Sequence, residues 1–189
     1  MATELKDYIR VYDGVFDKEF CRSVITQFES DSEYHEILDR DKRPSFTEMN
    51  ISQRYLAKDK NWTKIQEDIQ NVFVDYTNLY IEDLDIGPDF PAKYAFEQFR
   101  MKKYRTNVDE FKDHVDVGDH ASARRFLVMF LYLNEVGIGG ETHFPKLNYS
   151  IEPKCGRILM FPSLWLYRHA GKPVTAGQKY IVGSYLHYL

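Results

Sequence analysis

The stretch FKDHVDVGDH, residues 111–120, concentrates histidine and aspartate side chains immediately before a long apolar run. Within it, His114 and Asp116 are separated by one residue, and alternate side chains of an extended segment point to the same side. The pair could therefore chelate one metal ion while Val115 points away. The same residues also fit an ordinary polar turn, so the triplet alone does not decide between the two interpretations.

A third ligand for such an ion is available further along the chain. His169 follows an apolar segment and precedes a turn rich in Gly and Pro. Two imidazoles and one carboxylate on one face of a metal leave coordination positions open, and this donor set is typical of non-haem Fe(II) oxygenases. His114, Asp116 and His169 are therefore the candidate metal ligands, whereas His120 is interpreted as a solvent-facing loop residue.

Lys179 opens the last apolar segment, KYIVGSYLHYL, ten residues after His169. By strand alternation it shares a face with Tyr185 and His187. A lysine at such a place is commonly an exposed edge charge. If the site instead holds Fe(II), one carboxylate and a dianionic keto acid, one buried ammonium restores neutrality, and any unpaired charge would be costly. Lys179 is therefore a candidate for binding the distal carboxylate of a keto-acid co-substrate.

These candidate residues lie in the second half of the chain, and the first half predicts helices that would support them. Residues 17–30 and 61–83 have apolar side chains at helical spacing, and Asn61 is the predicted N-cap of the longer helix. Residues 31–52 are polar and irregular and predict a loop with an edge strand near its end. The core-facing stripe of the longer helix is expected at Trp62, Ile65, Ile69, Phe73 and Tyr76.

After the break GPDFP at residues 87–91, the sequence pattern changes from helical to β-rich. Short β-rich runs are separated by Gly, Pro and Asn turns, at residues 94–104, 124–133, 141–153, 156–163 and 179–189. Helices followed by many strands predict a mainly β (α+β) fold in which a helical layer supports a β-sandwich or jelly roll. We expect a single domain over 1–189, with helical support and irregular loops over 1–90 and a jelly-roll catalytic core over 91–189.

The composition fits a globular protein and argues against several classes of partner. Hydrophobic residues make up 43% and charged residues 29%. A net charge of −4 and a pI near 5.9 disfavour a nucleic-acid partner. The sequence has no apolar signal core and no run of membrane-spanning length, so we expect a cytoplasmic protein with no membrane partner. Cys21 and Cys155 are too few for a disulfide scaffold and are expected to be reduced thiols.

The ordered set of motifs resembles the 2-oxoglutarate/Fe(II)-dependent dioxygenases, and within them the prolyl 4-hydroxylase-like branch. The resemblance covers residues 99–187 and rests on YRTNVDEFKDHVD, RRFLVMFLYLNEVGIGGETHFP and HAGKPVTAGQKYIVGSYLHY. A tyrosine, the HxD triplet, a strand with Tyr-Leu, GGET-x-FP, a distal His and a Lys ten residues beyond it follow in that order. A lysine rather than an arginine at position 179 favours the prolyl hydroxylase branch. The resemblance implies a double-stranded β-helix of jelly-roll type.

The resemblance also implies which residues bind the metal and the co-substrate. Iron would be bound by His114, Asp116 and His169, with no further catalytic residue. Lys179 would form an ion pair with the C5 carboxylate of 2-oxoglutarate, and the Tyr104 hydroxyl would donate a hydrogen bond to the same co-substrate. Thr142 would line the same pocket. Tyr104 lies one residue further from the HxD triplet than the family pattern has it.

Substrate-binding residues are implied in the same way. Arg125 and His187 match positions that contact a peptide substrate in the family, and Tyr185 stands where the family usually has Trp. The polar segments 31–50 and 105–113 are expected to supply loops that cover the substrate.

The expected activity is Fe(II)- and 2-oxoglutarate-dependent hydroxylation of a C–H bond with O2, with ascorbate as a reductant. The resemblance favours a prolyl residue in a peptide or protein, in the manner of procollagen-prolyl 4-hydroxylase. A related hydroxylase acting on a free amino acid, a nucleobase or another small molecule is the first alternative. A catalytically silent jelly-roll binding protein is the second, and the presence of all three ligands and the lysine together argues against it. The sequence gives neither the substrate nor the oligomeric state.

Overall fold

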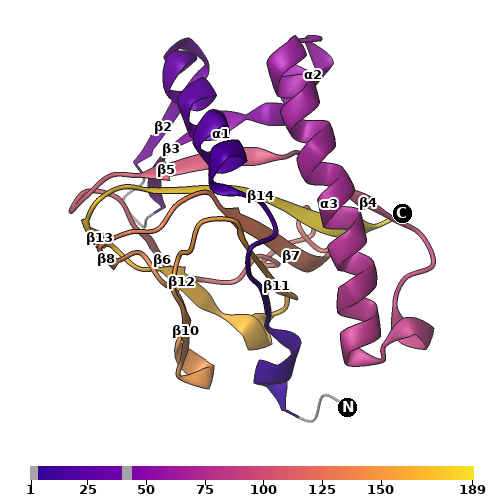
Figure 1. Ribbon diagram of the computed structural model, residues 1–189. Helices are drawn as coiled ribbons and strands as arrows, with labels where there is room; N and C mark the ends of the chain where they lie inside the picture. The colour runs from indigo at the N-terminus through magenta and orange to yellow at the C-terminus, as the bar shows by residue number, and fades with distance from the viewer. Residues whose placement is uncertain (1–3, 40–43) are drawn as a thin grey trace.

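Two β-sheets lie face to face in a computed structural model that describes residues 4–39 and 44–189, and helices cover the outer face of the larger sheet (Figure 1). The larger sheet has the order β1 (Arg10–Tyr12), β11 (Arg157–Pro162), β7 (Arg125–Tyr132), β14 (Lys179–Tyr188), β5 (Arg100–Tyr104), β3 (Ser45–Asn50) and β2 (Glu36–Asp39), with β4 (Tyr94–Phe96) also paired to β14. The smaller sheet has the order β10 (Tyr149–Ile151), β9 (Thr142–Phe144), β12 (His169–Gly171) and β6 (Phe111–His114). A short ribbon pairs β13 (Val174–Ala176) with β8 (Ile138–Gly139). The predicted mainly β, double-stranded β-helix fold is confirmed by this arrangement and by its structural neighbours described below.

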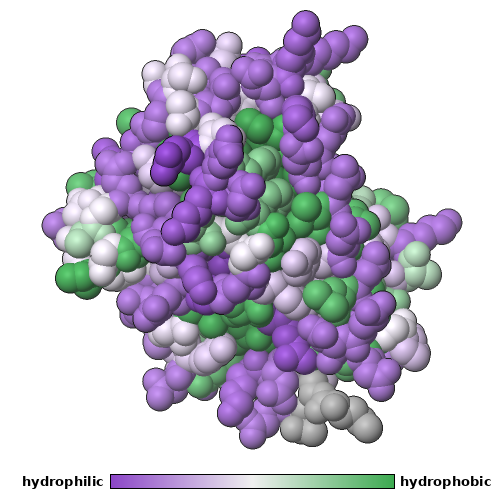
Figure 2. Space-filling model, in the orientation of Figure 1, coloured by the Kyte–Doolittle hydropathy of each residue, from purple (hydrophilic) through white to green (hydrophobic). Residues whose placement is uncertain are grey.

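Three α-helices form the supporting layer: α1 (Lys18–Ser30), α2 (Ile51–Leu56) and α3 (Lys60–Leu84). One-turn 3₁₀ helices occupy Leu5–Tyr8, Ser32–Tyr34, Gly87–Asp89, Pro145–Leu147 and Trp165–Tyr167. On the face seen in Figure 2, hydrophilic side chains predominate and apolar residues show between α1 and α3. In the parts of the chain that the structure describes, no helix has the length and apolar character needed to cross a membrane.

The strands in the middle of the larger sheet are buried on both faces. On β7, Leu127, Met129 and Leu131 pack toward the helices, whereas Val128 and Tyr132 pack into the space between the two sheets. This follows from the period-two alternation of strand side chains. The molecule therefore has two hydrophobic layers, and the inner one surrounds the candidate site.

Helix α3 begins two residues earlier than the sequence predicts, so the assignment of Asn61 as its N-cap is wrong. The N-cap is Asp59, whose Oδ1 accepts hydrogen bonds from the backbone N–H groups of Asn61 at 3.1 Å and Trp62 at 3.2 Å. The buried face of the helix also differs from the apolar stripe, because Gln66 and Thr77 are buried while Ile65 and Tyr76 are only partly so. Gln66 is accommodated by a hydrogen bond from the Ser52 hydroxyl, and the Thr77 hydroxyl donates to the Phe73 carbonyl.

The prediction of an irregular loop over residues 31–52 is also wrong for most of its length, because strands occupy Glu36–Asp39 and Ser45–Asn50. Residues 40–43 of this segment lie outside the described parts of the chain. Strand β3 lies between β5 and β2 and is not an edge strand, and nearly all of it is buried. Its polar residues are buried with partners: the Ser45 hydroxyl donates to Asp109, and Glu48 accepts from Arg100. Because buried polar side chains such as Ser45 and Glu48 have partners, the sequence of this strand lacks the apolar alternation that would indicate a central position.

The first half of the chain therefore contributes more than helices and loops. Strands β1, β2 and β3 complete the larger sheet by pairing with one another or with β11 and β5. The assignment of a single domain over 1–189, divided at residue 90, stays a prediction. Cys21 and Cys155 are both free thiols.

The position of the α3 N-cap gives a first testable prediction. Asp59→Ala should lower the free energy of unfolding by about 1 kcal/mol, because two backbone donors of the first turn lose their acceptor. The matched control is Asn61→Ala, which loses only an exposed hydrogen bond to Gln27 and should cost about a third as much or less. Urea denaturation of the two variants beside the wild type measures both values. An equal or larger effect at Asn61 would contradict the assignment.

Candidate active site

The three candidate metal ligands are brought together by the pairing of two strands of the smaller sheet. Strands β6 and β12 are antiparallel, and their register places His169 directly opposite His114. Asp116 follows β6 by two residues and lies between the two imidazoles. Its Oδ1 is 3.8 Å from His114 Nε2 and its Oδ2 is 3.7 Å from His169 Nε2. The potential ligand atoms all lie within 4.8 Å of one another, which is close enough for one ion to contact all three.

Each imidazole is held in the orientation that a metal ligand requires. His114 Nδ1 donates to the Lys112 carbonyl at 2.9 Å, and His169 Nδ1 donates to the Tyr167 carbonyl at 3.0 Å. Because a carbonyl oxygen can only accept, both Nδ1 atoms carry a proton, and the Nε2 atoms are the ring nitrogens that face Asp116. Burial, and then the neighbouring His169, lower the pKa of His114 to about 4, so that this ring is neutral at physiological pH. Phe111 stacks on it with 3.6 Å between the ring centroids.

The carboxylate of Asp116 is fixed by a second set of contacts. The Tyr185 hydroxyl donates to Asp116 Oδ1 at 2.8 Å, and Arg125 Nη1 donates to the Asp116 carbonyl at 3.2 Å. The Arg125 guanidinium lies 4.1 Å from the centroid of the Tyr185 ring. Burial and the adjacent carboxylate raise the pKa of Tyr185 well above its usual value, so its hydroxyl stays protonated as a donor. Tyr185, expected only as a substrate-facing wall, thus also contacts a candidate metal ligand.

Arg125 and His187, the other two residues expected to contact substrate, share Glu97. Arg125 Nε and Nη2 each donate to one Glu97 oxygen at 2.8 Å, and His187 Nδ1 is 3.8 Å from Glu97 Oε1. Glu97 directly follows β4, which pairs with the end of β14 and so carries this carboxylate to His187. Sequence reasoning missed Glu97, because it is one of many acidic residues and only the β4–β14 pairing indicates its role.

The residues expected to hold the co-substrate meet at the other end of the same cavity. Lys179 and Tyr104 are direct cross-strand neighbours on β14 and β5, and the Lys179 ammonium lies 4.3 Å from the centroid of the Tyr104 ring. Lys179 Nζ donates to the Gly140 carbonyl at 2.8 Å and is almost fully buried. Burial lowers the pKa of Lys179 to about 7. Thr142, on β9 of the facing sheet, forms a 2.6 Å hydrogen bond with the Tyr132 hydroxyl.

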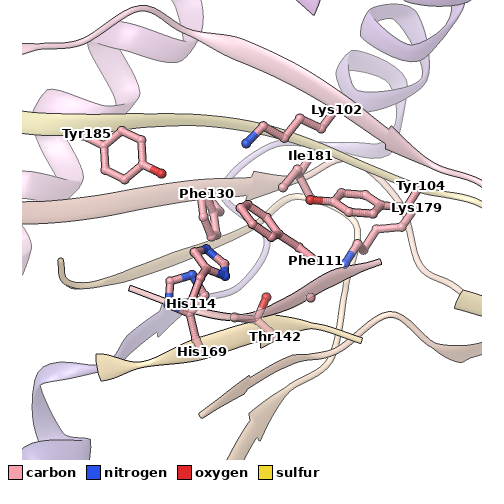
Figure 3. Close-up of a pocket in the computed structure, with 11 residues that line it drawn as sticks. Lys102, Tyr104, Phe111, His114, Phe130, Thr142, His169, Lys179, Ile181 and Tyr185 are labelled. Carbon is pink, nitrogen blue, oxygen red and sulfur yellow. The ribbon is translucent and has the colours of Figure 1, made fainter. Parts of the chain in front are cut away.

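Figure 3 shows these groups around one cavity between the two sheets, with Lys179 at one end and His114 and His169 toward the other. The cavity is lined by Lys102, Tyr104, Phe111, His114, Phe130, Thr142, His169, Gly171, Lys179, Ile181 and Tyr185. Sequence reasoning missed Lys102, Phe111 and Phe130 as lining residues, whereas strand alternation places Ile181 on the same face as Lys179. Lys102 could have been found, because period-two alternation on β5 puts it on the same face as Tyr104. His120, by contrast, is exposed as expected.

The donor set of the site fits an iron(II) ion. Two imidazoles and one carboxylate converge, and mixed nitrogen and oxygen ligands of this kind suit Fe(II) better than the thiolate sets of structural zinc sites. His169 and Asp116 are buried, while the side chain of His114 is 20% exposed, so the open side of the triad faces the cavity.

Comparison with known proteins shows which family the second half of the chain is similar to. Residues 99–187 match the model of the 2OG-Fe(II) oxygenase superfamily. A candidate prolyl 4-hydroxylase of Acanthamoeba polyphaga mimivirus is 30% identical in an alignment of 142 positions that covers 70% of this chain and 55% of that protein. Prolyl 4-hydroxylase subunit alpha-1 of Homo sapiens is 25% identical in an alignment of 134 positions that covers 62% of this chain and 24% of that protein. The chain thus spans about half the length of the viral relative and about a quarter of the human one.

Solved structures share the fold at lower identity. A viral collagen prolyl hydroxylase from Paramecium bursaria Chlorella virus-1, in complex with 2OG, matches with a TM-score of 0.72 at 21% identity, over 96% of this chain and 97% of that one. A prolyl hydroxylase in complex with a hypoxia inducible factor peptide fragment from Trichoplax adhaerens matches with a TM-score of 0.72 at 14% identity, over 96% and 84%.

The comparisons support a 2OG-Fe(II) oxygenase of the prolyl hydroxylase-like type, as the sequence motifs predict, and the family model matches slightly less than half of the chain. The cluster of His114, Asp116 and His169 fits an Fe(II) ion of the kind that this superfamily uses.

The hydrogen bond between Tyr185 and Asp116 gives a second prediction. Tyr185→Phe should weaken binding of Fe(II) by about tenfold or more, because Asp116 loses the donor that orients its carboxylate. Anaerobic titration with Fe(II) measures the dissociation constant. Tyr149→Phe, at a half-exposed tyrosine of the smaller sheet, is the control and should bind Fe(II) like the wild type. Unchanged affinity in Tyr185→Phe would show that the hydroxyl does not support the ligand.

Proposed function

We propose that this protein is an Fe(II)- and 2-oxoglutarate-dependent dioxygenase that hydroxylates a prolyl residue of a peptide or protein. The observation that carries the proposal is the convergence of His114, Asp116 and His169 at one end of a cavity that has the buried Lys179 at its other end. Similarity to prolyl 4-hydroxylases supports the choice of a prolyl substrate.

In this proposal His114, Asp116 and His169 hold the iron, and the bound Fe(II) with 2-oxoglutarate and O2 supplies the oxidising chemistry for a C–H bond. The three ligands occupy one side only, which leaves room for the co-substrate on the other. The Nδ1–carbonyl hydrogen bonds keep both imidazoles in the ligating tautomer, and Tyr185 keeps the carboxylate in place. Ascorbate as a reductant stays a prediction.

Lys179 would bind the distal carboxylate of 2-oxoglutarate, with Tyr104 and Thr142 beside it. Its ammonium donates one hydrogen bond to the Gly140 carbonyl, and an ammonium has three donors. No carboxylate lies within salt-bridge distance of it among residues 4–39 and 44–189, so a buried positive charge is available for an anion. Gly171 keeps the space open, because a Cβ there would lie 3.6 Å from Lys179 Nζ.

The substrate would enter on the side of the triad where Arg125, Tyr185 and His187 lie. The side chains of Arg125 and His187 are 27% and 16% exposed, so both still offer an edge to a peptide while Glu97 holds them in position. Within the segment 105–113, the buried carboxylate of Asp109 accepts hydrogen bonds from the side chains of Arg105 and Ser45. A covering role for the segments 31–50 and 105–113 stays a prediction.

The activity is tested by succinate release with Fe(II), 2-oxoglutarate and a panel of proline-containing peptides, free amino acids and nucleosides. We expect turnover with one or more peptides and a mass gain of one oxygen on proline. Asp116→Ala should lose both iron binding and turnover, because an uncharged site without the carboxylate cannot hold Fe(II) with two imidazoles alone. Turnover with only free amino acids or only nucleosides would replace the peptide by a small-molecule substrate. Absence of Fe(II) and 2-oxoglutarate binding would refute the proposal as a whole.

Removing the cation at the far end of the cavity gives a third prediction. Lys179→Met should raise the dissociation constant of 2-oxoglutarate by about a hundredfold or more, since the buried carboxylate would be left without its partner. Calorimetric titration of 2-oxoglutarate into the metal-loaded protein measures the constant. Lys172→Met, at an exposed lysine outside the cavity, is the control. An unchanged constant in Lys179→Met would remove Lys179 from the co-substrate site.

The lowered pKa of Lys179 gives a fourth prediction, on the pH dependence of 2-oxoglutarate binding. In the ligand-free protein the pKa of Lys179 is about 7, and pairing with a carboxylate raises it. Affinity should therefore be highest below pH 7 and fall by up to about tenfold per pH unit above it, until the pKa of the complex is reached. Titrations between about pH 6.5 and 8.5 measure this slope. Lys179→Met should lack it, and a slope that persists in that variant would assign the titration to another group.

A further inference from the structure

A second cation, Lys102, extends into the same cavity from β5. Figure 3 shows its amine directed between Tyr185 and Ile181, on the side of the cavity opposite His169. Its side chain is only 17% exposed and is therefore largely buried. The residue was not among those that the sequence motifs indicate.

The ammonium of Lys102 has little to balance its charge. Glu48 is the one carboxylate within 4.0 Å of it in the described parts of the chain, at 3.9 Å, which is too long for a hydrogen bond. The other oxygen of Glu48 accepts from Arg100, so this carboxylate already has a closer cationic partner. The remaining neighbours are aromatic faces, with the Phe46 centroid at 4.7 Å and the Phe111 centroid at 5.8 Å. No hydrogen bond from Lys102 Nζ occurs within residues 4–39 and 44–189.

The other charges around the cavity are accounted for once the proposed cofactors are bound. Iron(II), Asp116 and the keto-acid carboxylate sum to zero, and Lys179 balances the distal carboxylate of 2-oxoglutarate. Arg100 balances Glu48. Lys102 remains as one positive charge that is largely removed from water, with three donors and no acceptor, and such a group is costly unless something pairs with it.

We infer that Lys102 binds a carboxylate of the substrate, so that the reacting C–H bond lies close to a negatively charged group. This inference rests on the proposed function and names the class of substrate. The carboxylate could be an acidic side chain next to the reacting proline or the α-carboxylate of a free amino acid. Both present the same chemistry to an ammonium, and the experiment below separates them.

Two other roles for Lys102 make different predictions. If it bound the keto-acid carboxylate of 2-oxoglutarate, its removal would weaken binding of the co-substrate; that carboxylate, however, has the metal as its partner. If it served only to hold Glu48 near Arg100, its removal would change stability and leave substrate preference as it was.

The chain offers a matched control in the next residue. Lys103 lies on the same strand with the same 17% side-chain exposure, but it faces the helices and pairs with Glu29 at 2.8 Å. Lys103→Met therefore removes an equally buried charge from β5 without touching the cavity. Lys102→Arg keeps the charge and tests whether any cation at this place suffices.

The test uses two substrate pairs with wild type, Lys102→Met, Lys102→Arg and Lys103→Met. One pair is a proline peptide with Asp or Asn before the proline, and the other is free L-proline or L-prolinamide. Substrate affinity is measured by calorimetry on protein loaded with Mn(II) and 2-oxoglutarate, and KM and kcat are measured on the Fe(II) enzyme. We expect the wild type to prefer one carboxylate-bearing member by about tenfold or more, and Lys102→Met to lose this preference mainly through affinity and KM. Lys103→Met should keep it, and Lys102→Arg should keep part of it.

The outcomes separate the inference from the function on which it rests. A wild-type enzyme that turns over substrate without preferring the carboxylate in either pair overturns the inference, as does a preference that survives in Lys102→Met. A raised dissociation constant for 2-oxoglutarate in Lys102→Met would assign the residue to the co-substrate instead. Which pair shows the preference identifies the source of the carboxylate. Failure of the wild type to bind Fe(II) or 2-oxoglutarate at all refutes the proposed function and, with it, this role for Lys102.

Discussion

The antiparallel register of β6 and β12 determines the site, because it places His169 opposite His114 and leaves Asp116 between them. In this arrangement the Asp116 carboxylate lies less than 4 Å from the Nε2 atoms of both imidazoles, and His169 and Asp116 are buried. Backbone carbonyls and Tyr185 hold the three side chains in this geometry. The folded structure therefore holds the three ligands close together, and a bound cation would stabilise this arrangement further.

The two sheets give the cavity its chemical character. The smaller sheet contributes the imidazoles and Thr142, and the larger sheet contributes the cations Lys102 and Lys179, with aromatic rings from both sheets between them. Aromatic walls exclude water and therefore strengthen each charge that remains inside. Lys102 and Lys179 lie on the neighbouring strands β5 and β14, so two cationic side chains line the wall of the cavity that the larger sheet forms.

The class of fold and the clustering of His114, Asp116 and His169 could be predicted from the sequence, because both depend on motifs that are local or follow in a fixed order. The roles of these residues and of Lys179 stay predictions. The HxD triplet needs only strand alternation, and the distal His and Lys lie a fixed spacing apart. Glu97 could not be assigned a role in the same way, since its position depends on the pairing of β4 with β14. Alternation on β5 places Lys102 on the same face as Tyr104, but the sequence does not indicate its role. The strand predicted near the end of residues 31–52 corresponds to β3, but the prediction of an edge strand was wrong, because its buried polar groups Ser45 and Glu48 are paired with Asp109 and Arg100 and do not mark an exposed edge.

Strand β14 joins the helical layer to the cavity through alternate residues. Tyr180, Val182 and Leu186 face the helices, whereas Lys179, Ile181 and Tyr185 face the cavity. Adjacent residues of this strand therefore have different roles: those on one face contribute to the stability of the fold, and those on the other face line the cavity. Engineering could adjust either property by changing every second residue, with Gly183 as the exception: a methyl group there would meet the Phe130 ring at 2.8 Å, so this position has no freedom to vary.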